Sequence, residues 1–174
     1  METLKAIARR KSVRSYKPDP VPEEVLNTIL AAGCAAPVGM GMYDSLHLTV
    51  IQNTEMLGRI SEAVKKIMNR GGSPLYGAPV LIIISSRESM PVAGIEYANA
   101  SCLIDNMLIA ATDQGLGSVY IWGAGPAVSS DISLMKALAI PEGFKPVSGL
   151  VLGFPESPDM SEKELKITIS LNRI

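Results

Sequence analysis

The amino-acid sequence predicts one layered domain in which helices pack against a β-sheet. The 174 residues fit a single domain, 1–174, and no repeat, linker or low-complexity stretch divides them. Segments with apolar residues at helical spacing alternate along the chain with short apolar segments typical of strands. Residues 78–85 (APVLIIIS) form a continuous apolar run, which is typical of a strand covered on both faces.

The expected elements follow from apolar spacing together with turn and capping residues. Pro22, Glu23 and Glu24 open a predicted helix, because proline and acidic residues are favoured in a first turn. Thr54 is the predicted N-cap of the next helix, and Gly115 the predicted C-cap of the longest one. Spacing alone does not decide whether the sheet is parallel or mixed. In chain order we expect a helix at 2–10, a helix opening at 21–24, a strand at 46–52, a helix from 54 towards 69, a loop at 69–74, a strand at 78–85, a helix at 93–114, a strand at 118–122, a helix at 130–138, a strand at 147–153 and a polar tail at 155–174 with a β-like stretch at 167–171.

The predicted helix at 93–114 indicates a second chain. Leu103 and Met107 share one face, while Ile104, Leu108 and Ile109 cover much of the rest. A helix that is apolar nearly all round is buried nearly all round. A domain of this size buries few helices so completely, and the mean hydropathy of +0.24 is high for a small monomer. We therefore expect a homodimer, with a single central helix inside a monomer as the alternative.

Composition argues against several classes of function. The net charge of −1 gives no overall attraction to nucleic acid or to an anionic membrane. No stretch approaches the ~20 apolar residues of a membrane span, and the first residues lack a secretory h-region, so we expect a cytoplasmic protein. Cys34 and Cys102 lie in apolar helical patterns and are expected to be buried thiols. With His47 as the only histidine, we expect neither a metal site nor a histidine-based triad.

Residues 9–17 (RRKSVRSYK) form the densest cluster of charge. Five cationic side chains lie there, and Ser12 and Ser15 place hydroxyl groups among them. Guanidinium groups bind phosphate through paired hydrogen bonds, and hydroxyl and backbone N–H groups complete such sites. The composition therefore indicates an anion-binding site. A solvated basic face or a nucleic-acid patch has a similar composition, although the near-neutral net charge disfavours nucleic acid.

The string RRKSVRSY, soon followed by PVPEEVL, resembles the opening motif of the FMN-dependent nitroreductase family. Further similarities follow in the order of that family and span nearly the whole chain. The resemblance implies an α+β fold with a mixed, largely antiparallel central sheet flanked by helices. It also implies an intertwined homodimer with FMN at the subunit interface. The similar segments are AAP at 35–37, LHLTV at 46–50, GAPVLII at 77–83, GLGS at 115–118, IPEG at 140–143 and GLVLGFP at 149–155.

The resemblance also assigns roles to positions of this chain. Residues 10–14 fall where the family holds the phosphate and ribityl chain of FMN, and residues 121–124 where backbone N–H groups lie beside the flavin N5 and O4. Residues 37–40 fall on the stretch that reaches the flavin of the neighbouring subunit. The extension at 155–174 is expected to pack on the partner subunit and to supply a basic phosphate ligand, for which Arg173 is preferred over Lys163. The expected FMN-binding residues are Arg10, Lys11, Ser12, Arg14, Pro37, Val38, Gly39, Met40, Ile121, Trp122, Gly123, Ala124 and Arg173.

The chain departs from the family pattern after residue 37. Many members have S-x-x-N-x-Q-P-W there, with polar side chains that touch the flavin pyrimidine, whereas this chain has VGMGMYDS. Asp44 or the backbone of residues 39–41 are the candidates to replace those contacts. The chain is also short for the family, so we expect an open flavin site. Simpler roles remain for some of these residues, with Trp122 as a core residue and Met40 and Met42 as gap-fillers.

The implied function is an oxidoreductase with a ping-pong mechanism. NAD(P)H reduces FMN and leaves, and a nitroaromatic, quinone or other electron-poor acceptor then takes the electrons. No side chain stands out as an acid or base, which is consistent with a flavin that itself carries the hydride. The alternatives are a specialised ene-reductase or reductive dehalogenase, and a flavin-binding or storage protein without turnover.

Overall fold

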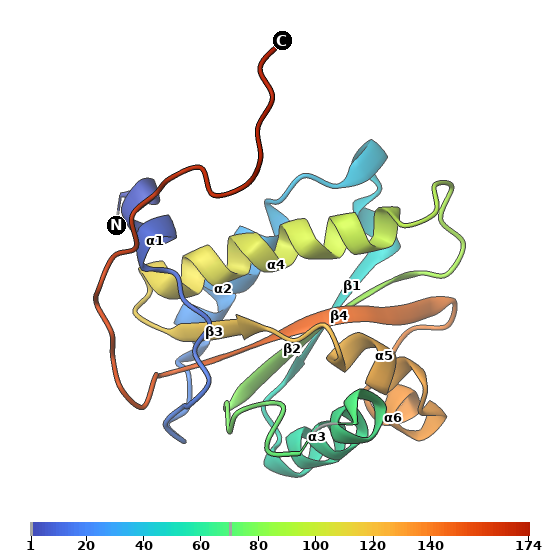
Figure 1. Cartoon of the computed structure of the whole chain (residues 1–174). Coiled ribbons are helices and arrows are strands. Elements are labelled where there is room, and N and C mark those ends of the chain that lie inside the picture. Colours follow the sequence, from blue (N-terminus) through green and yellow to red (C-terminus); the bar gives the residue numbers. More distant parts are fainter. Residues whose placement is uncertain (1, 70) are drawn as a thin grey trace.

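The computed structural model describes residues 2–69 and 71–174 and has three layers, with a four-stranded sheet between two layers of helices (Figure 1). The strands lie in the order β1 (Leu46–Ile51), β2 (Val80–Arg87), β4 (Phe144–Gly153) and β3 (Gly117–Tyr120), and each pairs antiparallel with its neighbours. Among the described residues, one parallel bridge joins Ser12 to Ser118 beside β3. The expected α+β fold with a largely antiparallel sheet is confirmed.

Helices α1 (Thr3–Arg9), α2 (Glu23–Cys34) and α4 (Ile95–Asp113) form one outer layer. Ile82 and Ile84 of β2 point into this layer. Helices α2 and α4 approach closely at Gly33, where an added Cβ would overlap the Met107 side chain. Each fully buried aliphatic side chain here contributes about 1.5–3 kcal/mol. The fully buried large residues of this core are Leu26, Ile29, Ile82, Ile84, Ile104, Met107, Leu150 and Leu152.

Helices α3 (Thr54–Met68), α5 (Ala124–Ser129) and α6 (Ile132–Ala137) cover the opposite face of the sheet. Leu81 and Ile83 of β2 point into this second core, which also contains Ile60 and Leu134. Alternate residues of β2 therefore pack into the two different cores, one on each face of the sheet. The expectation of a strand covered on both faces is confirmed, because residues 80–86 are all buried.

Strand β4 begins at Phe144, earlier than the expected start at 147. Pro146 accounts for the difference, because proline lacks an N–H and disfavours the interior of a central strand. The ladder between β2 and β4 shifts register at this point, where Ile84 pairs with Ser148 and Ser85 pairs with Pro146. The resulting β-bulge admits the proline and lets the strand continue.

The helix expected at 130–138 is confirmed as α6, which is shorter at both ends, whereas α5 at 124–129 was not predicted. Asp131 separates them and caps α6, accepting hydrogen bonds from the amides of Ser133 and Leu134. The predicted cap at Thr54 is wrong. The Asn53 side chain accepts from the Met56 amide at 2.9 Å, and Thr54 is the first helical residue.

Helix α4 is the longest helix and ends, as predicted, before Gly115, whose φ of 77° continues the chain in the left-handed region. Its outward face is not covered by its own chain, since Ala98, Ser101, Cys102 and Asp105 are exposed. The expectation of buried thiols is wrong within this chain, because both Cys34 and Cys102 are exposed and free. None of the helices in the described part of the chain combines the length and hydropathy needed to cross a bilayer.

The C-terminal tail leaves β4 at Phe154, crosses α1 and then leads away from the body (Figure 1). The expected β-like stretch at 167–171 forms no strand within the chain. Its apolar side chains are exposed, as are those of residues 165 and 174. The stretch is bent at Ile169, and within the described chain it lacks the partner edge that a ladder requires.

A pair of glycine substitutions tests the packing of α5 on β4. An added Cβ at Gly125 would overlap the backbone carbonyl of Val147, so Gly125→Ala should lower the free energy of unfolding by about 1–3 kcal/mol. Gly58 lies inside α3 with open space around its α-carbon, so Gly58→Ala should raise that free energy by roughly 0.5–1 kcal/mol. Urea unfolding of both variants measures the two changes. Equal effects would contradict the close approach at Gly125.

Candidate functional site

The basic segment, residues 9–17, runs from the end of α1 along the edge of the sheet. The Val13 amide donates to Ser118 of β3, and the Lys17 amide donates to Phe154 after β4. The hydroxyl of Tyr16 donates to the Val13 carbonyl at 2.8 Å, and burial raises the pKa of this hydroxyl, so it stays protonated. Gly117 permits the close approach, because an added Cβ would lie 2.8 Å from the Val13 side chain. The segment is therefore held extended, and successive side chains point to opposite sides.

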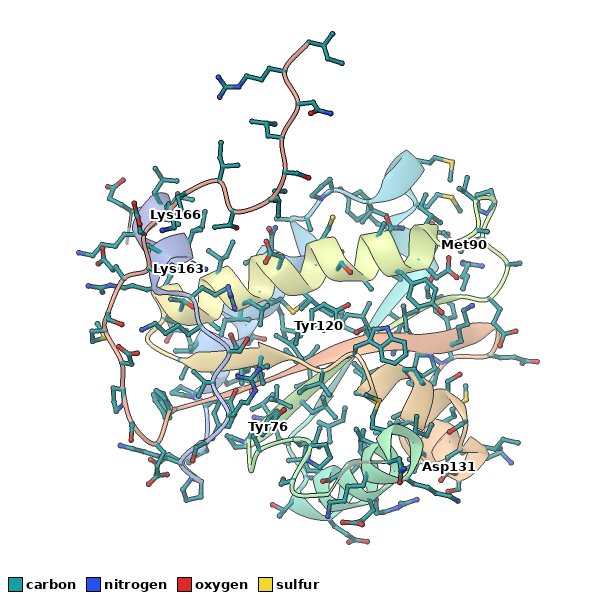
Figure 2. The ribbon with its side chains drawn as sticks, viewed as in Figure 1. Tyr76, Met90, Tyr120, Asp131, Lys163 and Lys166 are labelled. Carbon is teal, nitrogen blue, oxygen red and sulfur yellow. The ribbon has the colours of Figure 1, made fainter. Side chains whose placement is uncertain are left out.

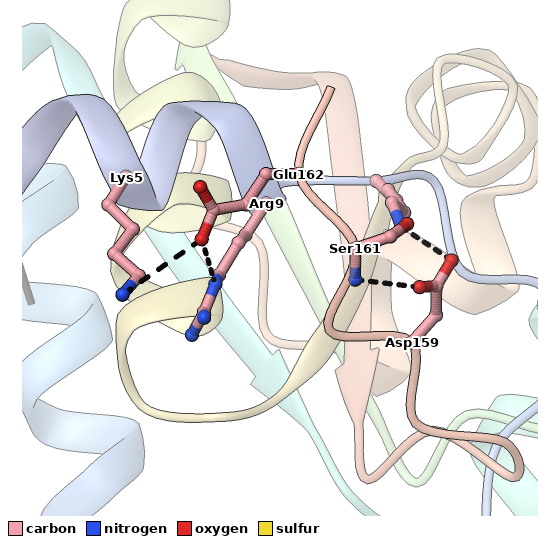
Figure 3. Close-up of polar contacts among 6 residues, drawn as sticks. Lys5, Arg9, Asp159, Ser161 and Glu162 are labelled. Atoms are coloured by element: carbon pink, nitrogen blue, oxygen red, sulfur yellow. Dashed lines mark hydrogen bonds and ion pairs between the residues drawn. The ribbon is translucent and has the colours of Figure 1, made fainter. Parts of the chain in front are cut away.

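One side of the basic segment is neutralised by the C-terminal tail. Arg9 pairs with Glu162 at 3.0 Å, and Lys5 approaches the same carboxylate at 4.0 Å (Figure 3). Lys11 donates to both Asp159 and Ser161. The hydrogen bond from Lys11 lowers the pKa of Asp159, so its carboxylate stays charged in mildly acidic solution. Lys11, an expected FMN-binding residue, therefore faces the tail.

A cavity of about 400 Å³ lies on this neutralised side, under the tail. Arg9, Lys11 and Val13 line one wall, and the tail supplies Pro158 and Met160. Both cations of that wall are already in ion pairs. The cavity therefore offers a mostly apolar surface without a free cation from the basic segment.

Arg14 points to the other side of the segment, where it lines a second cavity of about 480 Å³. This volume is within the ~300–1,000 Å³ range of small-molecule sites. Its guanidinium lies 6.0 Å from the centre of the Tyr76 ring and donates to the Ser12 carbonyl. Within residues 2–69 and 71–174, neither Arg14 nor Arg10 is in an ion pair. Arg14 is therefore the cation of the basic segment that lines this second cavity without an ion-pair partner in the described chain.

The opposite wall of the second cavity is the turn between β3 and α5. Ile121, Trp122 and Gly123 line it, and the Trp122 side chain is 54% exposed. The Ile121 amide donates to the Gly149 carbonyl, and the Ala124 amide donates to the Ile121 carbonyl. The amides of Trp122 and Gly123 have no partner among the described residues. Ala124 is fully buried behind the turn. The turn that lines this cavity together with Arg14 thus carries two backbone N–H groups without a partner in the described chain.

The loop before β2 and the end of α3 complete the second cavity, and the sequence reasoning missed both. Gly71, Gly72, Ser73 and Pro74 form one rim, and Tyr76 follows them in the left-handed region with a φ of 56°. A bulky residue seldom adopts this conformation, and such strain is concentrated at functional sites. The glycine-rich stretch was the only available signal, because nothing local indicates that Tyr76 meets Arg14. The residues from α3 are Val64 and Met68.

Residues 37–40 lie at the far end of α4 from the basic segment. The amide of Gly39 donates to the Asn99 side chain in the first turns of α4, whereas the basic segment approaches the other end of that helix. None of Pro37, Val38, Gly39 and Met40 lines the second cavity. Within one chain the structure therefore brings Arg14 together with residues 121–123 but does not bring residues 37–40 to them.

The two candidate basic residues of the tail occupy different places. The Lys163 amide donates to Ala8, its side chain reaches the Arg10 carbonyl at 3.4 Å, and Figure 2 shows it beside α1. Arg173 lies in the exposed last stretch, which leads away from the body in Figure 1. Within one chain, Lys163 and not the preferred Arg173 lies at the basic segment.

Comparisons with known proteins identify the family of the chain. The model of the nitroreductase family matches residues 7–154. A Methanothermobacter thermautotrophicus protein, provisionally named NADH dehydrogenase/NAD(P)H nitroreductase, is 35% identical over 91% of this chain and 80% of its own length. The FMN reductase [NAD(P)H] of Bacillus subtilis is 28% identical over 95% of this chain and 70% of its own. The crystal structure of a Bacteroides fragilis nitroreductase with bound FMN has a TM-score of 0.83 at 30% identity, covering 99% of this chain and 100% of that one. The chain belongs to the nitroreductase family.

Proposed function

We propose that the chain is an FMN-dependent oxidoreductase that takes electrons from NAD(P)H and passes them, in a ping-pong reaction, to electron-poor acceptors such as nitroaromatics and quinones. The observation that carries this proposal is the second cavity, which is lined both by a guanidinium without an ion-pair partner and by a turn with two unpartnered backbone amides, among the residues that the structure describes. The names of the relatives support it, since they include FMN reductase [NAD(P)H] and a nitroreductase with bound FMN.

The residues around the second cavity fit the chemistry of FMN. Arg14 and Ser12, with Arg10 beside them, would hold the phosphate, because guanidinium and hydroxyl groups suit its oxygens. We leave Lys11 out of this set because it is paired with Asp159. The amides of Trp122 and Gly123 would donate to the polar edge of the ring, where fixed N–H groups stabilise developing negative charge. When bound, FMN supplies the two-electron transfer between NAD(P)H and the acceptor.

We propose that a second copy completes each site. Residues 37–40 do not reach the second cavity of their own chain, yet Met40 is 61% exposed at the other end of α4. The outward face of α4 and the apolar side chains of the tail are likewise uncovered. Residues 155–163 of the extension expected to pack on the partner lie on their own chain, so a homodimer would bury these surfaces with residues 164–174 lying on the partner and Arg173 carried to the partner's surface. Such an obligate interface buries more than about 2,000 Å².

The exposed Trp122 at the rim of the cavity favours a broad choice of acceptor. A site with few walls discriminates poorly, because each apolar contact contributes only ~1–3 kcal/mol of selectivity. Rates with a panel of nitroaromatics and quinones should therefore lie within about one order of magnitude of each other. A sharp preference for one compound would contradict the open site.

The visible spectrum of the purified protein and the consumption of NAD(P)H test the proposed function. We expect a yellow protein that binds FMN and oxidises NAD(P)H only when an acceptor is present. A yellow protein without acceptor-dependent oxidation would identify a flavin-binding or storage protein. Including an activated alkene and a halogenated aromatic in the panel separates an ene-reductase and a reductive dehalogenase from a nitroreductase. A protein that does not take up FMN would overturn the proposal.

A further inference from the structure

The turn between α2 and β1 contains an exposed residue, Met40, whose backbone amide makes no hydrogen bond to the described residues. Gly39–Gly41 form a short 3-10 turn, in which the Gly41 amide donates to Val38 and the Met42 amide to Gly39. Met40, at the centre, has a φ of 57° and is 61% exposed. Its amide has no hydrogen-bond partner within residues 2–69 and 71–174. Met40 thus adopts a left-handed conformation that is unfavourable for a non-glycine residue, and its backbone N–H remains without a partner in the described chain.

Asn99 of α4 fixes the position of this turn. Its side-chain oxygen accepts the Gly39 amide at 2.9 Å, although the two residues are 60 positions apart in the sequence. Asn99 is only 3% exposed, and its side-chain nitrogen is buried without a partner. A buried polar group left unpartnered destabilises the fold, so its retention points to a functional constraint. Ile95, one turn earlier on α4, packs against Gly39 so closely that an added Cβ would overlap its side chain.

The other end of the turn is held by side chains of β2 and of the turn itself. The guanidinium of Arg87 bonds both the carboxylate and the backbone carbonyl of Asp44, at 3.2 and 3.3 Å. The Tyr43 hydroxyl donates to the Ala36 carbonyl. Asp44, one candidate to contact a flavin, is therefore engaged elsewhere. Several backbone amides of this region have no partner among the described residues, those of Val38, Met40, Tyr43 and Asp44, and Met40 is the one that lies at the centre of the 3-10 turn with a left-handed φ.

We propose that Asn99 is a positioning residue that holds the Gly39–Gly41 turn so that the Met40 amide donates a hydrogen bond to the pyrimidine ring of the partner subunit's flavin. This inference rests on the proposed function, in which the turn reaches the site of the second copy. The isoalloxazine ring carries its carbonyl acceptors on the pyrimidine, N5 in the central ring and only methyl groups at the opposite end. A free N–H that meets an end of the ring therefore has acceptors only at the pyrimidine end. A backbone N–H group would thus bind the pyrimidine ring in place of the polar side chains that many members of the family have there.

Asn99→Ala, compared with Asn106→Ala, separates this role from a general loss of stability. Asn106 is on the same helix and donates to the Ala32 carbonyl of α2 at 3.0 Å, so it makes a similar bond that does not involve the turn. Both variants should lose thermal stability. Only Asn99→Ala should weaken flavin binding, by about three- to tenfold, as expected when one hydrogen bond is misplaced. The loss should be equal for FMN and riboflavin, because both contain the pyrimidine ring, and it should come with a shift in the visible spectrum of the bound flavin.

A compensating pair tests the same geometry without removing the asparagine. Gly39→Ala should displace the turn through its overlap with Ile95 and weaken the binding of both flavins. Adding Ile95→Ala removes the overlapping atoms, so the double variant should bind flavin within about twofold of Ile95→Ala alone. Affinities are measured by quenching of flavin fluorescence, with circular dichroism as the check on folding.

The outcomes distinguish this inference from the proposed function. A wild-type protein that binds no flavin removes the proposed function and this inference with it. A wild-type protein that binds FMN, with Asn99→Ala matching Asn106→Ala in affinity and spectrum, overturns the positioning role alone. Failure of Ile95→Ala to rescue Gly39→Ala also overturns it. Selective weakening of both flavins by Asn99→Ala, together with rescue in the double variant, supports it.

Discussion

Replacing Arg14 with alanine should weaken FMN binding about ten- to a hundredfold and leave riboflavin binding nearly unchanged. The guanidinium lines the second cavity without an ion-pair partner in the described chain, so it is free to bind a phosphate. A charge-assisted hydrogen bond contributes about 1.5–3 kcal/mol, and each ~1.4 kcal/mol is a factor of ten in affinity. Riboflavin has the same ring and no phosphate. Arg14→Lys should recover only part of the loss, because an ammonium group cannot form the paired bonds.

Arg9→Ala is the matched control for this measurement. Arg9 belongs to the same basic segment and its change removes the same charge, but its side chain is paired with Glu162 on the tail side (Figure 3). It should alter FMN affinity less than about threefold, which is the scale of a screened surface charge. Fluorescence titrations of both flavins with both variants make the comparison. If Arg14→Ala changes the affinities for FMN and riboflavin equally and only slightly, Arg14 does not bind the phosphate and is an ordinary solvated surface residue.

Elements with a strong apolar period were predictable, and the errors arose where tertiary packing overrides local signals. The buried run in β2 and the long helix α4 were predicted to within two residues at each end. The predicted strand at 147–153 was too short, because a proline such as Pro146 disfavours a regular central strand. The bulge that accommodates Pro146 arises from the pairing of β4 with β2, which the local sequence does not show. Helix α5 was missed because Gly125 and Pro126 disfavour a helix, yet Gly125 lets α5 contact β4 closely.

The candidate site was predictable in part, because a linear motif shows composition and does not show which way each side chain faces. The basic segment was identified, but its alternation places Lys11 against the tail and Arg14 in the cavity. Tyr76 and Asn99 were missed, since their partners are 62 and 60 residues away in the sequence. Long-range contacts of this kind leave no local pattern. Within one chain α4 is not buried nearly all round, because Ala98, Ser101, Cys102 and Asp105 are exposed, and the homodimer expected to cover this face stays a prediction.

Placing aspartate at Ile167 and Ile169 should convert a stable dimer into a monomer at micromolar concentration. These side chains are 68% and 81% exposed in the single chain, and Figure 1 shows the tail leading away from the body. Burial of each isoleucine against a partner contributes about 1.5–3 kcal/mol, so losing two per tail should weaken association well over a hundredfold. The fold of each chain should be unchanged, because this stretch packs on nothing within its own chain.

Thr168 and Ser170 supply the control, since they lie next to the same isoleucines and carry no large apolar side chain for a partner to bury. Placing aspartate at these two positions adds the same charge and should leave the dimer intact. Light scattering over a dilution series measures association, and circular dichroism checks the fold. Because the proposed flavin site is shared, FMN content should fall with the dimer in the first pair of variants and not in the second. A stable, FMN-loaded monomer would contradict both the shared site and the role given to the tail.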